Sequence, residues 1–133
     1  MTEDQKQEII LLAYTLWNIC KYLDTEKGIR DLEVLKDVVS MPGGGSLTCL
    51  LGEKLANKKD LYSQLGWFIY YTLEGEPFNS KNKAMIVLVL AWVLGHYDLG
   101  YNIEDVAKYI DNLDTMRQGN ADISGWFSEH VSK

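Results

Sequence analysis

Histidine and cysteine are scarce in this chain of 133 residues, which has two of each. No group of them with acidic residues has the spacing of zinc ligands, and residues 111–122 depart from the order of an EF-hand loop, where Met116 replaces the essential glycine. Cys20 and Cys49 stand among apolar residues at helical spacing, a pattern typical of buried thiols. We therefore expect no metal, no cofactor and a reducing, cytoplasmic setting.

Basic side chains are also few, since 13 Lys and Arg stand against 19 Asp and Glu, for a formal net charge of −6. Binding to nucleic acid or to an anionic membrane requires clustered Lys and Arg. The cluster Lys54, Lys58 and Lys59 is too small to anchor a recognition helix on a duplex. The N-terminus, MTEDQKQE, is polar and acidic, unlike a signal peptide. The sequence thus predicts binding to neither nucleic acid nor membrane.

Long hydrophobic runs are limited to residues 84–94, eleven uninterrupted apolar positions. A membrane-spanning helix needs about 20. A buried strand and a buried helix both fit the β-branched content, but Ser80 stands where an N-cap would, and apolar and aromatic residues continue to Tyr97. This length favours a buried helix, in which Leu88 is expected to be a core side chain.

Apolar residues recur at spacings of three and four along most of the remaining chain. The stripes cover residues 9–23, 29–39, 47–55, 61–73, 103–113 and 123–131, and Asn57 and Asn102 stand where the fourth and fifth of these helices need caps. Residues 61–73 and 84–94 are apolar beyond a single stripe. We therefore expect one all-α domain over residues 1–133, a bundle of six or seven helices around a central apolar hairpin of these two segments.

Three consecutive glycines stand in residues 41–54, MPGGGSLTCLLGEK. A phosphate-binding P-loop needs a strand before the glycines and a lysine directly after them, whereas the nearest downstream lysine is Lys54. A nucleophile elbow needs glycine at the position of Thr48. We expect a mobile joint that lets a short helix at Ser46 fold back on the core, with anion binding at that helix as the alternative.

His96 and Asp98 are the arrangement that could pair an imidazole with a carboxylate for catalysis. His96 also stands near the end of the expected helix, where an imidazole can bond to the last carbonyls. No carboxylate lies inside an apolar run, where burial would raise its pKa. We expect no enzymatic activity, and an enzyme without a recognisable motif stays an alternative.

Carboxylates gather in residues 84–133, which carry seven Asp and Glu against three Lys and Arg. The helix expected from residue 103 turns Ile103, Val106, Ile110 and Leu113 inward, so this stripe explains its folding and the carboxylates face outward. The candidate partner-binding residues are Glu104, Asp105, Asp111, Asp114 and, as a fifth, Asp98. Complementary charge on such a face would speed encounter with a basic partner; a solvated face that only aids solubility is the alternative.

In size, acidity, helical content and lack of catalytic motifs, the whole chain resembles the immunity proteins of bacterial contact-dependent inhibition and related toxin systems. This resemblance of type implies a non-enzymatic antagonist that blocks a basic toxin by direct binding. A nuclease is the natural target because its substrate site is positively charged. The alternative is a helical module with an apolar ligand or lipid between aromatic-rich helices, lined by Trp67, Phe68, Tyr70, Tyr71, Trp92 and Tyr97.

Overall fold

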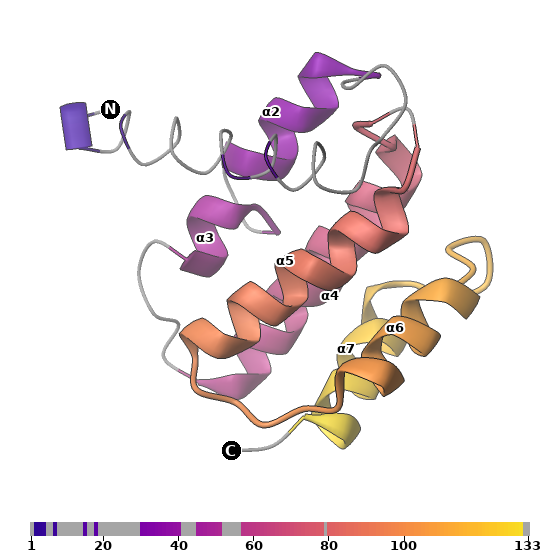
Figure 1. The fold of residues 1–133 in the computed structure, drawn as a ribbon. Coiled ribbons are helices and arrows are strands. Elements are labelled where there is room, and N and C mark those ends of the chain that lie inside the picture. Colours follow the sequence, from indigo (N-terminus) through magenta and orange to yellow (C-terminus); the bar gives the residue numbers. More distant parts are fainter. Residues whose placement is uncertain are drawn as a thin grey trace.

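The computed structural model describes residues 2–4, 7, 15, 18, 30–40, 45–51, 57–78 and 80–131. Within these ranges the chain is all-α, with no strand. The helices are, in order, α2 (Leu32–Ser40), α3 (Leu47–Leu51), α4 (Lys58–Gly75), α5 (Asn82–His96), α6 (Ile103–Asn112) and α7 (Asn120–His130) (Figure 1). The all-α prediction is confirmed for these residues, whereas the apolar residues of the expected stripe over 9–23 lie outside them.

Helix α4 occupies the middle of the bundle, where it contacts α2, α3, α5 and α7. It runs antiparallel to α5, and α6 and α7 lie together along one side of this pair (Figure 1). The most extensive contact of α4 is with α7, at the opposite end of the chain. No helix among the described residues is long and apolar enough to cross a lipid bilayer.

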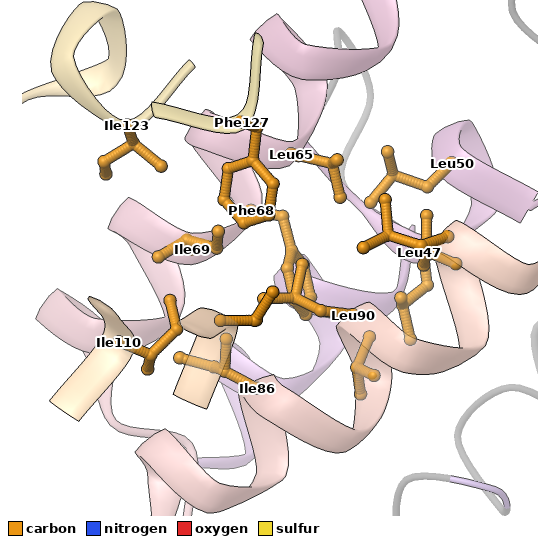
Figure 2. Close-up of a cluster of buried hydrophobic side chains, with 14 of the residues drawn as sticks. Leu47, Leu50, Leu65, Phe68, Ile69, Ile86, Leu90, Ile110, Ile123 and Phe127 are labelled. Carbon is orange, nitrogen blue, oxygen red and sulfur yellow. The ribbon is translucent and has the colours of Figure 1, made fainter. Parts of the chain in front are cut away.

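The hydrophobic core lies where α3, α4, α5, α6 and α7 meet. Figure 2 shows side chains from all five helices converging there, and each is fully buried: Leu47, Leu50, Leu65, Phe68, Ile69, Ile86, Leu90, Ile110, Ile123 and Phe127. Although α5 is apolar on every side, its buried residues lie before and after Val87 and Leu88, which are themselves partly exposed. Leu88 is therefore not the core side chain that the sequence predicts, because it lies on the outer side of α5.

Two of the three predicted helix caps have the expected chemistry. The side chain of Asn57 accepts a hydrogen bond from the Asp60 N–H at 2.9 Å, and Asn102 caps α6 in the same way. Ser80, however, is not the N-cap of α5: the cap position is Lys81, with a left-handed φ of 59° and no side-chain cap bond. The Asn82 amide instead bonds both the N–H and the C=O of Phe78, which fixes the turn and delays the helix start to Asn82.

Gly45, part of the segment expected to be a mobile joint, is packed against α4. Gly45 and Ser46 are buried, and the Gly45 N–H donates to the side-chain oxygen of Gln64 on α4. A Cβ at Gly45 would lie 2.8 Å from the Cβ of Trp67, and the φ of 75° also favours glycine. This glycine therefore lets the chain before α3 lie directly against α4; residues 41–44 lie outside the described ranges.

Candidate partner-binding surface

Helix α6 carries the acidic surface and is held to α5 through Val106 and Ile110, both buried. Leu113, just past its end, is buried as predicted. Ile103 is 43% exposed, so the prediction that it faces inward is wrong. Its position in the first turn explains this, because the buried stripe begins one turn later, at Val106.

Glu104 and Asp105 are exposed in the first turn of α6. Their backbone N–H groups donate to the Asn102 side chain at 2.9 and 3.1 Å. Negative charge at this end interacts favourably with the helix dipole, by about 0.3–1 kcal/mol per residue. Their position at the N-terminus of α6 therefore gives these two carboxylates a role in folding as well as a place on the acidic surface.

Asp114 does not lie on the helix with the other acidic residues, because α6 ends at Asn112. Its carboxylate accepts a 2.9 Å hydrogen bond from the Met116 N–H and lies 3.7 Å from Nε of Arg117. Its carbonyl accepts from the N–H groups of Arg117 and Gln118. Asp114 therefore has a structural role in the turn that leads towards α7.

Asp98 lies in the turn after α5, with a left-handed φ of 55°. Asp adopts this conformation more readily than most residues, so the turn itself accounts for its presence. The side chain is exposed. In Figure 1 the connection from α5 to α6 crosses the base of the molecule before α6 begins.

Asp111 differs from the other four because its position is unfavourable for the helix. It is exposed in the last turn of α6, at the negative end of the helix dipole. No ion pair joins its carboxylate to another described residue. Its backbone carbonyl, in contrast, accepts a 2.7 Å hydrogen bond from Lys83 Nζ on α5. The backbone of Asp111 therefore contributes to the fold through its bond to Lys83, whereas its negatively charged side chain has no such structural role among the described residues.

Two hollows flank α6. The hollow on the α5 side has a volume of about 560 Å³ and is mainly apolar. Its lining residues are Lys83, Ala84, Val87, Leu88, Ala107, Lys108, Ile110 and Asp111. The hollow on the α7 side has a volume of about 360 Å³, lined by Asp105, Lys108, Tyr109, Asn112, Trp126 and His130. Asp111 and Asp105 thus border different hollows.

A stack of three rings forms one wall of the hollow on the α7 side. Trp126 lies between Tyr109 and His130, and the centroid of its ring is 4.3 Å from the centroid of each neighbouring ring. The Tyr109 hydroxyl is buried, with no hydrogen-bond partner among the described residues. Burial, and then the charge of Asp122, raises the Tyr109 pKa to about 12. Sequence reasoning missed this stack, although the i, i+4 spacing of Trp126 and His130 was a signal for half of it.

His96 and Asp98, the pair considered for catalysis, lie in different environments. No hydrogen bond joins His96 to Asp98 among the described residues; Nε2 of His96 is buried without a described partner, while Asp98 is exposed. No group of three or more His, Cys, Asp and Glu among the described residues could hold a metal ion.

The six aromatic residues considered for an apolar pocket occupy different environments. Phe68 is fully buried in the core, and the Tyr97 hydroxyl donates to the Leu50 carbonyl at 2.7 Å. Trp67 and Tyr71 stack with each other on the surface. Of the six, Tyr71 lines a hollow, which lies between α2 and α4. No protein-family model, no curated protein and no solved structure matches this chain, so its surface chemistry carries the functional argument.

Proposed function

We propose that the chain is a non-enzymatic, acidic binding protein that acts as an immunity protein in the bacterial cytoplasm. It blocks a basic toxin, a nuclease domain above all, by direct binding. The proposal includes one helical domain, a bundle of six or seven helices around α4 and α5. The net charge of −6 and the exposed acidic residues on and around α6 support this function.

The observation that carries the proposal is the position of Asp111. A carboxylate in the last turn of a helix opposes the helix dipole, so its presence there is better explained by binding than by folding. Beside it lies the mainly apolar α5–α6 hollow. Apolar contact at the centre with charge at the edge is the usual composition of a protein interface.

The five acidic residues divide into two kinds under this proposal. Glu104, Asp105, Asp98 and Asp114 have structural roles and add to the long-range field that attracts a basic protein. Asp111 is the residue that we expect to form a close ion pair with the partner. Loss of field residues lowers the association rate, whereas loss of a desolvated pair raises the dissociation rate.

A second function has an observation of its own. The α5–α6 hollow, at about 560 Å³, falls within the range of about 300–1,000 Å³ usual for small-molecule sites. Ala84, Val87 and Leu88 would contact an apolar ligand there. Lys83 and Lys108 at its edge would suit a carboxylate head group.

The experiment uses the open reading frame directly upstream of the gene for this chain, because immunity genes stand directly after toxin genes. We expect its product to arrest growth when expressed alone, and growth to return when the chain is co-expressed. The two purified proteins should form a complex whose association rate falls as salt is added. An upstream product that is harmless, or that does not bind the chain, contradicts the proposal.

Asp111→Asn tests the surface, with Glu129→Gln as its matched control. Glu129 is also an exposed carboxylate in the last turn of a helix, α7. The two variants therefore change net charge and helix dipole alike. We expect Asp111→Asn to raise the dissociation rate about tenfold or more and Glu129→Gln to change it little. Equal effects would place the contact elsewhere, and saturable fatty-acid binding to the α5–α6 hollow without any complex would favour the second function.

A further inference from the structure

A group of three aromatic rings lies on α4, and two of them, Trp67 and Tyr71, are exposed. Trp67 is 38% exposed and Tyr71 is 43% exposed, and their rings stack at 5.3 Å with an interplanar angle of 16°. The Tyr70 ring stands nearly perpendicular to both. Tryptophan and tyrosine on a surface are typical of binding hot spots. Rings that already hold one another lose little conformational entropy when a partner binds.

A hollow of about 280 Å³ lies beside this group, between α2 and α4. Its lining residues are Val34, Asp37, Val38, Gly45, Tyr71, Glu74 and Gly75. Two glycines allow its walls to come this close, because a Cβ at Gly75 would lie 2.5 Å from Val34 Cγ1 and one at Gly45 would meet Trp67. The volume is at the lower limit for a small-molecule site, which suits a single side chain.

The two charged residues described in the lining of this hollow are both acidic. Asp37 on α2 and Glu74 on α4 are both exposed, and no Lys or Arg is among the described lining residues. Both carboxylates lie in the last turn of their helices, where the dipole disfavours negative charge. Arg30 binds the carbonyls of Gly75 and Glu76 at the end of α4 and does not line the hollow. Like Asp111, the two carboxylates therefore lie where their negative charge is unfavourable for the helix.

We infer that this hollow binds an arginine side chain of a basic protein partner. The inference rests on the proposed function for the nature of that partner. The aliphatic part of the arginine would contact Val34 and Val38, as long charged side chains do on apolar surface. The planar guanidinium would stack on Tyr71 and donate to Asp37 and Glu74. A second contact surface, separate from α6, follows from this chemistry.

The direct test is an NMR titration of the full chain with N-acetyl-arginine amide, with N-acetyl-citrulline amide as the neutral probe of the same shape. We expect the arginine amide to shift the backbone signals of Asp37, Tyr71 and Glu74 saturably, and the citrulline amide to leave them nearly unchanged. Asp37→Asn with Glu74→Gln should weaken binding of the arginine amide about tenfold, because charge-assisted hydrogen bonds are lost. Tyr71→Leu should weaken it while keeping the wall apolar.

The control is Asp111→Asn with Glu129→Gln, which removes the same charge from the last turns of α6 and α7. It should leave binding of the arginine amide unchanged. The inference is wrong if the arginine amide gives no saturable shift, if the citrulline amide binds equally, or if both double variants weaken binding alike. Arginine binding at the hollow, together with an upstream product that neither arrests growth nor binds, would instead overturn the proposed function and leave the hollow's chemistry standing.

Discussion

Lys83 Nζ donates a 2.7 Å hydrogen bond to the backbone carbonyl of Asp111. A cation on α5 therefore satisfies the C-terminal end of α6, where positive charge is favourable. The same end carries the Asp111 carboxylate, which has the unfavourable sign. Acidic residues at the N-terminus of α6 thus stabilise the helix, whereas Asp111 at its C-terminus does not, and this difference in stability can be measured.

Glu104→Gln with Asp105→Asn should lower the free energy of unfolding by about 0.5–2 kcal/mol at low salt, because both carboxylates interact favourably with the helix N-terminus. Asp111→Asn should leave it unchanged or raise it by a few tenths. Urea denaturation at low and high salt measures both, and the difference between the variants should shrink as salt screens the charges. A greater loss from Asp111→Asn would show that Asp111 stabilises the fold.

Leu90→Ala should cost about 2–5 kcal/mol of unfolding free energy, as truncations of fully buried leucines do. Leu90 is fully buried on the core side of α5, whereas Leu88 lines the open α5–α6 hollow. Leu88→Ala is the matched variant, and we expect it to cost clearly less because it leaves no enclosed cavity. Equal losses in urea denaturation would contradict this arrangement of α5.

Tyr109→Phe should leave stability unchanged or raise it, because it removes a buried hydroxyl that has no partner among the described residues. Tyr97→Phe is its counterpart and should cost about 1 kcal/mol, since the Tyr97 hydroxyl donates to the Leu50 carbonyl. Urea denaturation near neutral pH compares the two. A larger loss from Tyr109→Phe would reveal a partner for that hydroxyl.

The raised pKa of Tyr109 also predicts an alkaline effect. Because the folded pKa of about 12 exceeds the ordinary tyrosine pKa of 10.0, the folded protein holds this proton more tightly. The contribution to stability is complete below pH 10 and is lost as pH rises through 12. Tyr109→Phe should therefore reduce the fall in stability over this window. Ultraviolet titration of tyrosinate would show one fewer late-titrating tyrosine in the variant.

Gly45→Ala should destabilise the fold by about 1–2 kcal/mol from the left-handed backbone alone, and by more from the contact with Trp67. Gly125→Ala is the opposite case, because Gly125 lies within α7 and an added Cβ would meet no atom within 4 Å. It should stabilise the helix by about 0.5–1 kcal/mol. Thermal denaturation of the two variants should move the midpoint in opposite directions.

The sequence by itself determined the features that depend on neighbouring residues. Helical spacing of apolar residues identified the described helices other than α5, which the length of its apolar run identified. Asn57 and Asn102 identified two of the helix starts, because a cap acts within one turn. The exposure of all five acidic residues could also be predicted, since a charged side chain remains in water unless a partner compensates its burial. Tertiary structure did not change these features.

Only the tertiary structure decided which apolar side of α5 is buried, because every side of that helix is apolar and the contacts with α3, α4 and α6 make the choice. It likewise brought α7 against α4 and placed Asp37 opposite Glu74 across a hollow. These pairs are far apart in sequence, so no local pattern records them. Local spacing also does not reveal that α6 ends before Asp114. In the structure Asp114 belongs to the turn towards α7, where its carboxylate accepts a hydrogen bond from the Met116 N–H.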